Sequence, residues 1–108
     1  MRAAYRAEEK AARTAYDGLP REGRAYREAF TQLLIDAPLV RMAHWLAWLT
    51  TDAENARIAY RDAYGADQWE RDRLHDTLCV MQEAQVKLEA TIARRFCDTL
   101  HDPQDDIP

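Results

Sequence analysis

The sequence predicts an all-α fold, a compact bundle of about five helices with a long C-terminal helix. Only three glycines and four prolines occur in the 108 residues, which is few for a β-rich fold with its many turns. Apolar residues make up 47% of the chain and charged residues 31%, a balance typical of globular proteins. We therefore expect a single helical-bundle domain over residues 1–101, followed by an acidic C-terminal tail at 102–108.

Glycine and proline bound the first two predicted helices. We expect one helix over residues 2–16, with Gly18 just beyond its end. A second helix is expected over residues 20–35, because proline is tolerated in the first turn of a helix but not in its interior. Pro38 then marks a break and a new helix start.

Two further helices are predicted between Pro38 and the last glycine. The third covers residues 38–49. The stretch "TDAE" then has the pattern of a capping box, in which Thr51 would be the N-cap and Glu54 would bond back to it. The fourth helix would follow and run to residue 64, before Gly65.

The last predicted helix is the longest, from residue 68 to residue 100. "DQWE" repeats the capping pattern at its start, with Asp67 three residues before Glu70. Its apolar residues follow a mostly 4-3 spacing that predicts a face turned toward the bundle: Leu74, Leu78, Met81, Leu88 and Ile92.

The densest apolar stretch is "RMAHWLAWLT", residues 41–50. At 100° per residue, one side of this helix gathers a predicted core set: Leu39, Met42, Ala43, Leu46, Leu49 and Thr50. Trp45 lies at the edge of that side and is predicted to be core. Trp48 lies on the opposite side beside Arg41 and His44, where a second helix could bury it. Alternatively, an exposed Trp48 could stack on a base or anchor a protein interface.

Composition argues against several kinds of enzyme. The chain contains no serine, which excludes Ser-His-Asp hydrolysis. It has no glycine-rich phosphate loop, and no Glu-x-x-His pair of the helical di-iron type. We therefore expect a protein that is not an enzyme and that needs no cofactor.

Arginines recur on the first two helices. The spacing of Arg21, Arg24 and Arg27 places three guanidinium groups near the start of the second helix. Such a stripe, together with Arg41, could neutralise the phosphates of a single-stranded nucleic acid. The alternative is a solvated surface on which these arginines pair with neighbouring carboxylates. Residues 1–50 hold eight basic and six acidic residues, and residues 51–108 hold seven and thirteen, so the halves carry +2 and −6.

The two cysteines form a symmetric pattern with two histidines. His75 precedes Cys79 by four residues, and His101 follows Cys97 by four. The cysteines are 18 residues apart on one helix, about 27 Å at 1.5 Å per residue, too far for an intrachain disulfide. An antiparallel dimer crossing near Leu88 would bring the pairs together as zinc sites. Ordinary packing of small residues is the alternative.

Nothing in the sequence predicts export or a membrane span. The N-terminus carries charges throughout and lacks the apolar region of a secretory signal. The longest apolar zone, residues 33–49, is interrupted by four polar or proline residues and is too short to span a bilayer. We expect a cytoplasmic protein.

The stretch "AYREAFTQLLIDAPLVRMAHWLAWLTT", residues 25–51, resembles the small-subunit family of multisubunit CRISPR effector complexes. Members are short all-helical proteins with an aromatic and leucine-rich helix pair around an "LI…PL" junction, here Leu34, Ile35, Pro38 and Leu39. The resemblance covers about a quarter of the chain. It implies a non-catalytic subunit, of which several copies would guide a nucleic-acid strand along arginine-rich faces.

Three functional hypotheses follow. The first is a non-enzymatic assembly subunit, of the ribonucleoprotein kind that the resemblance implies, which self-associates, contacts other protein subunits and binds a strand through Arg21, Arg24, Arg27, Arg41 and Trp48. The second is a phage- or plasmid-encoded inhibitor that offers its acidic half to a host nucleic-acid-binding complex. The third is a metal-binding helical bundle that uses the His/Cys pairs.

Overall fold

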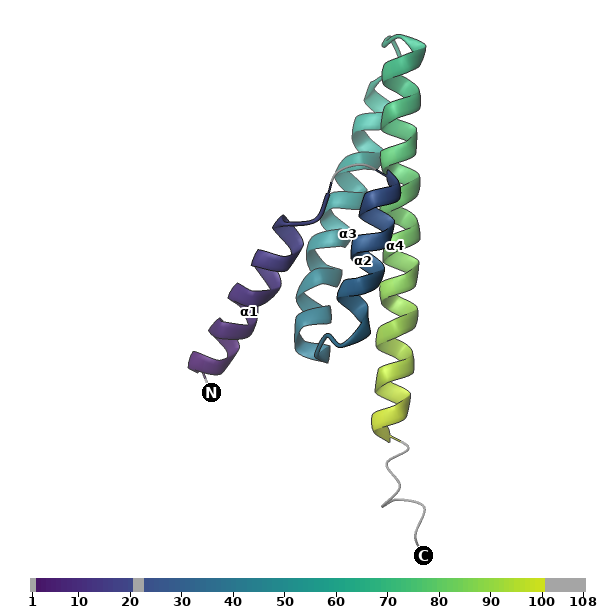
Figure 1. Ribbon diagram of the computed structural model, residues 1–108. Helices are drawn as coiled ribbons and strands as arrows, with labels where there is room; N and C mark the ends of the chain where they lie inside the picture. The colour runs from purple at the N-terminus through teal and green to yellow at the C-terminus, as the bar shows by residue number, and fades with distance from the viewer. Residues whose placement is uncertain (1, 21–22, 101–108) are drawn as a thin grey trace, which may run out of the picture.

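The structure is a computed structural model in which residues 2–20 and 23–100 are described. These residues form four helices and no strand (Figure 1): α1 (Arg2–Asp17), α2 (Gly23–Ile35), α3 (Leu39–Asp62) and α4 (Gln68–Leu100). The predicted all-α class and the long C-terminal helix are confirmed. The expected number of five helices is wrong.

A hairpin of α3 and α4 forms the spine of the molecule. The two helices run antiparallel, α1 packs on α3, and α2 packs on α4 (Figure 1). The shorter helices cover only part of the hairpin, and its upper end extends beyond both of them. We call this extension, residues 57–76, the arm.

The core lies where the four helices approach one another. Its fully buried large side chains come from α2, α3 and α4: Trp45, Phe30, Met42, Leu49 and Leu88. Trp45 is only 1% exposed, and its indole Nε1–H donates a hydrogen bond to the Ala12 carbonyl of α1 at 2.9 Å. Trp45 is thus confirmed as core. Ala43 and Thr50, which the wheel placed on the same side, are exposed.

The break predicted before Thr51 does not exist. The hydroxyls of Thr50 and Thr51 donate to the carbonyls four residues earlier, Leu46 at 2.7 Å and Ala47 at 3.3 Å. Thr51 is therefore inside a helix and is no N-cap. The capping pattern is overridden because no glycine or proline stops the chain and the buried side of the helix continues beyond Leu49.

The molecule is elongated, which corrects the expectation of a compact bundle. Its radius of gyration is 17.0 Å, and its extents are 64 × 32 × 21 Å. A compact domain of this length has a radius of gyration of about 13 Å. The difference arises because α4, with 33 residues, is about 50 Å long, and the shorter helices cannot cover it.

A single arginine fixes the lower end of α2. The Arg95 guanidinium, from α4, donates to the carbonyls of Leu34, Ile35 and Ala37 at 3.2, 2.5 and 3.0 Å. These carbonyls lie at the end of α2, where helical partners run out and the helix dipole favours a cation.

The start of α2 differs from prediction. Pro20 is not helical, and residues 21–22 lie outside the described part, so α2 begins at Gly23. A Cβ atom at Gly23 would lie 3.4 Å from Val80 of α4. The beginning of α2 therefore lies directly against the spine.

The start of α4 is capped as predicted. The Asp67 carboxylate accepts a hydrogen bond from the Glu70 backbone N–H at 2.9 Å. Leu78 and Leu88 of the predicted apolar stripe are buried. The remaining members of that stripe are half-buried. Leu74 lies on the arm, which lacks a third helix, whereas Met81 and Ile92 pack against the edge of the core.

Alanine substitutions at Thr51 and at Asp67 should change the free energy of unfolding in opposite directions. Thr51→Ala is expected to raise the free energy of unfolding by about 0.5 kcal/mol, because alanine has the higher propensity inside a helix. Asp67→Ala should lower it by about 1 kcal/mol, because a real N-cap is lost. Urea unfolding followed by circular dichroism measures both. A loss of about 1 kcal/mol for Thr51→Ala would mean that α3 begins anew at Thr51.

Candidate interaction surfaces

Trp48 lies in an aromatic cluster between α1 and α3. Its ring stacks on His44 with centroids 5.6 Å apart and meets Tyr16 edge-on, also at 5.6 Å. The Arg13 guanidinium lies 4.7 Å from the ring centroid, within the range of a cation–π interaction. The partly buried Trp48 ring is thus engaged within the chain, as expected of a side chain that a second helix covers.

Tyr16 of this cluster is half-buried and bonds a carboxylate. The Tyr16 hydroxyl donates a short hydrogen bond to the Asp52 carboxylate of α3. Burial, together with this bond, raises the pKa of Tyr16 above its usual range. Burial and the nearby Asp52 charge also raise the pKa of Tyr26 to about 12. The Tyr26 hydroxyl is buried and has no hydrogen-bond partner among the described residues.

The arginines proposed to bind phosphate are mostly paired with carboxylates. Arg27 bonds Glu83 of α4 through two nitrogens, at 2.7 and 3.3 Å. Arg41 bonds Glu8 of α1 at 3.1 and 3.2 Å. Both pairs therefore connect helices, and they leave less of the guanidinium for a strand.

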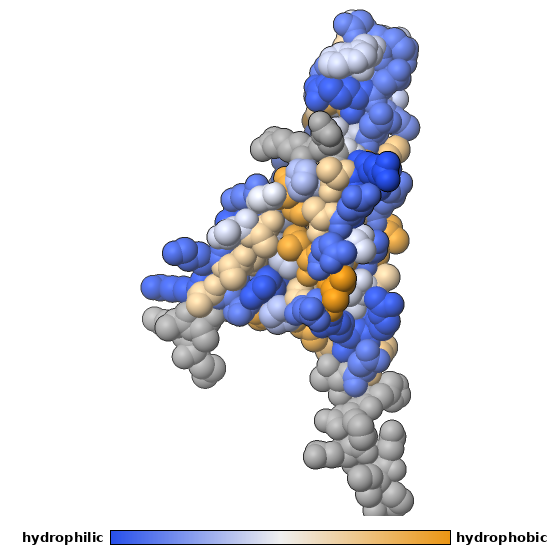
Figure 2. All heavy atoms as spheres, viewed as in Figure 1, coloured by the Kyte–Doolittle hydropathy of each residue, from blue (hydrophilic) through white to orange (hydrophobic). Residues whose placement is uncertain are grey.

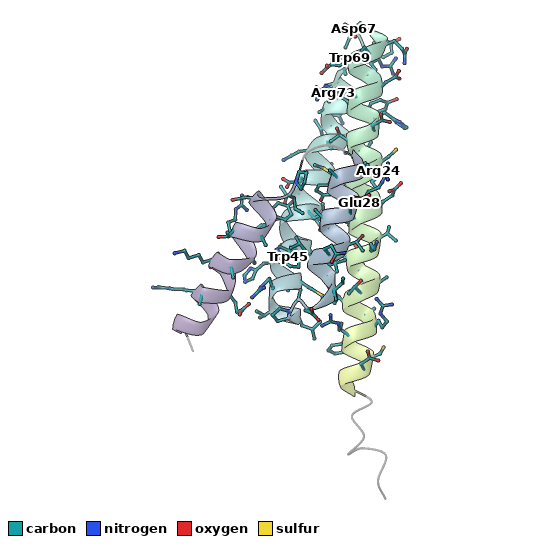
Figure 3. The ribbon with its side chains drawn as sticks, viewed as in Figure 1. Arg24, Glu28, Trp45, Asp67, Trp69 and Arg73 are labelled. Atoms are coloured by element: carbon teal, nitrogen blue, oxygen red, sulfur yellow. The ribbon has the colours of Figure 1, made fainter. Side chains whose placement is uncertain are left out.

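Arg24 is the most exposed of these arginines. Its side chain is 91% exposed and lies 3.2 Å from Glu28, one turn along α2 (Figure 3). An exposed pair of this kind contributes little stability, so Arg24 can exchange its partner. Arg21 lies outside the described residues. The described residues therefore contain no stripe of arginines of the kind that was predicted.

The tip of the arm carries two exposed aromatic residues. Tyr64 is 86% exposed and Trp69 is 73% exposed. Trp69 lies in the first turn of α4, near Asp67 and Arg73, at the end of the molecule opposite the chain ends (Figure 3). The sequence analysis did not select either residue. The signal was present, because Trp69 stands among polar neighbours beside the turn around Gly65.

Short-range bonds between side chains pair many of the charges along the arm. Arg73 bonds Glu70 at 2.6 and 3.2 Å, and Gln68 donates to Asp72 at 2.7 Å. On α3, Arg57 bonds Glu54 at 2.5 and 3.0 Å. The hydrogen bond from Arg57 lowers the pKa of Glu54. The arm thus presents its aromatic rings on a helical frame whose charges are largely internally matched.

The surface colouring separates the polar arm from the apolar lower part of the molecule. In Figure 2 the arm is hydrophilic over most of the visible face, whereas hydrophobic spheres gather lower, around the junction of α1 and α2. The aromatic tip residues are therefore isolated large rings in a polar surround.

The cysteines lie on α4 as the sequence suggested. Cys79 is half-buried and Cys97 is exposed, and both are free thiols. The Cys79 Sγ lies 3.7 Å from Nε2 and 3.8 Å from Nδ1 of His75. His101 lies outside the described residues. Among those described, no group of three or more potential ligands gathers to hold a metal ion within one chain.

Comparisons do not assign the chain to a family. No helix among the described residues is long and apolar enough to cross a bilayer. No protein-family model, no curated protein and no solved structure matches the sequence or the fold.

The raised pKa values of Tyr16 and Tyr26 predict a loss of stability at alkaline pH. In the unfolded chain both hydroxyls ionise near pH 10, whereas in the folded chain their pKa values are raised. The stability gained from the neutral tyrosines is therefore complete below about pH 10 and is lost as the pH rises toward about 12. We expect the urea midpoint to fall across this window.

Two tyrosine variants test whether the fall of the urea midpoint comes from the Tyr26 hydroxyl. Tyr26→Phe should give a shallower fall of the urea midpoint, because the buried ionisable hydroxyl is removed. Tyr64→Phe, at a position that is 86% exposed, should leave the wild-type pH profile unchanged. Identical profiles for Tyr26→Phe and the wild type would contradict the assignment.

Proposed function

We propose that this protein is a non-enzymatic assembly subunit that binds another protein through the tip of its α3–α4 arm. The observation that carries the proposal is the exposure of Trp69 and Tyr64 at the end of a projecting helical hairpin. Tryptophan and tyrosine are enriched among the residues that dominate binding energy at protein interfaces. Two such rings exposed at a helix-hairpin end have no packing role in the fold.

The construction of the arm supports this role. The rings stand on helix α4 and on the short turn before it, so little backbone order has to be created on binding. The arm also extends past α1 and α2, which leaves its tip accessible to a large partner (Figure 1).

The charge of the tip favours a protein partner over a polynucleotide. Residues 61–73 hold three arginines and four carboxylates, a net charge of −1. A surface that binds phosphates needs a positive excess. A mixed, nearly neutral rim around aromatic groups is the usual composition of a protein interface.

The resemblance to CRISPR small subunits leads to a more specific form of this proposal. Under it, the assembly would be a ribonucleoprotein and the strand would meet α2 at Arg24, the most exposed of the predicted arginines. The inhibitor hypothesis places its contact in the acidic second half of the chain and its tail, residues 102–108; the tail lies outside the described residues. Both are outcomes that the following experiment separates.

We expect the double variant Trp69→Ala/Tyr64→Ala to lose its partner. The tagged variant and the tagged wild type would be recovered from the native host, and bound proteins quantified by mass spectrometry. Loss of two anchoring rings should reduce recovery of the partner at least tenfold, since each such residue contributes about 2 kcal/mol or more. Circular dichroism should show unchanged helicity, because neither ring is buried.

The matched control is Ile35→Ala/Val40→Ala. These side chains are also exposed, at 56% and 43%, but lie away from the tip. Partner recovery should match that of the wild type. Equal recovery with the tip variant would overturn the proposal. Nucleic acid recovered with the wild type but lost with Arg24→Glu would support the ribonucleoprotein form, and loss of the partner on deletion of 102–108 alone would support the inhibitor.

A further inference from the structure

Three arginines among the described side chains are half-buried: Arg41, Arg71 and Arg95. Arg41 bonds the Glu8 carboxylate of α1, and Arg95 bonds three carbonyls at the end of α2. A guanidinium group carries five N–H donors, and its removal from water is costly unless protein acceptors replace the water. For Arg41 and Arg95, another helix supplies those acceptors.

Arg71 differs from the other two because the described residues offer it no acceptor. Its Nε–H is buried and has no hydrogen-bond partner there, and its guanidinium forms no ion pair with a described carboxylate. Buried donors in folded proteins are nearly always bonded, so an exception requires an explanation. A half-buried cation without an acceptor indicates that the acceptor comes from a ligand.

The carboxylates next to Arg71 in the sequence are bonded to other groups. Glu70 accepts two hydrogen bonds from Arg73, at 2.6 and 3.2 Å. Asp72 accepts a hydrogen bond from the Gln68 side chain at 2.7 Å. The neighbouring charges are therefore matched among themselves, and Arg71 is left available.

The Tyr60 ring of α3 holds the Arg71 side chain in place. The Arg71 guanidinium carbon lies 5.8 Å from the ring centroid, within the range of a cation–π interaction. His75, one helical turn after Arg71, also contacts this ring, with centroids 5.3 Å apart. The guanidinium is thus oriented before a ligand arrives, which lowers the entropic cost of binding.

Arg71 lies close to the exposed tip of the arm. It follows Trp69 by two residues on α4, and its neighbour Tyr60 precedes Tyr64 by four. Residues 61–73 carry a net charge of −1, which disfavours a phosphate group with its two negative charges. A carboxylate carries a single charge, and its two oxygens match the fork of a guanidinium group.

We propose that Arg71 binds a carboxylate of the partner protein, through two hydrogen bonds from a guanidinium that rests on Tyr60. This inference rests on the proposed function, because it names the chemistry of the partner that the arm binds. An aspartate or glutamate of the partner supplies the acceptors that Arg71 lacks. The guanidinium is already partly out of water, so little further desolvation is needed when the pair forms.

Stability distinguishes a binding role of Arg71 from a structural one. Arg71→Met keeps an aliphatic stem over Tyr60 and removes only the charged group. The urea midpoint of the full chain should not fall, because no hydrogen bond of the chain is lost and a half-buried charge is removed. Arg95→Met is the matched comparison, and it should lower the midpoint because three carbonyls lose their donor. A fall for Arg71→Met as large as that for Arg95→Met would overturn the proposal.

A capped hexaglutamate peptide tests the class of ligand directly. NMR of the isotope-labelled full chain follows the Nε–H signals of Arg71 and of Arg94, which is exposed and lies about 35 Å further along α4. Arg71 should respond at roughly a tenth of the peptide concentration that Arg94 requires, because its guanidinium is already oriented. Equal responses of the two arginines would contradict the proposal. So would a response of Arg71 to inorganic phosphate, or to a single-stranded oligonucleotide, at a lower concentration than to hexaglutamate.

Partner recovery from the native host separates this inference from the proposed function. Arg71→Met should reduce recovery about tenfold, because one member of a partly buried charge pair is removed, and Arg94→Met should leave recovery unchanged. If Trp69→Ala/Tyr64→Ala loses the partner and Arg71→Met keeps it, the proposed function stands and this inference is wrong. If the tip variant keeps the partner, the proposed function fails, and the hexaglutamate titration decides whether Arg71 binds carboxylates.

Discussion

Leu49, Ala53 and Ala56 are buried on one side of α3, four and three residues apart. They continue the line of side chains that faces α4 across the point where the threonines could have started a new helix. Keeping this line buried requires α3 to remain one helix. The long hairpin, the arm and the distance between the tip and α1 all follow from that continuity, because a break at Thr51 would have allowed the chain to fold back into a shorter bundle.

The two short helices are attached to this hairpin by different means. α1 is held by aromatic packing, with the indole of Trp45 bonded to its Ala12 carbonyl and Trp48 in contact with Tyr16 and Arg13. α2 is held at its upper end by close approach of Gly23 to the spine, and at its lower end by a guanidinium that caps its carbonyls. Arginine suits that second role because its planar fork can donate to several acceptors at once.

Helical spacing, glycines and prolines were enough to predict the class, the last helix and the burial of Trp45. Local capping patterns were less reliable, because Asp67 and Thr51 stand in similar patterns and only Asp67 caps a helix. The difference is tertiary: beyond Gly65 the chain must reverse, whereas before Thr51 nothing stops it. The partners of Arg27 and Arg41, Glu83 and Glu8, lie 56 and 33 residues away. No local spacing could reveal those pairs, whereas the exposure of Trp69 could have been expected from its polar neighbours beside the turn at Gly65.

The use of arginine inside the fold changes which surfaces are suited to binding. Three arginines connect helices: Arg27, Arg41 and Arg95. Their guanidinium groups are bonded to carboxylates and carbonyls of the chain itself. What stays exposed is aromatic at the tip of the arm and weakly apolar along the outer side of α4.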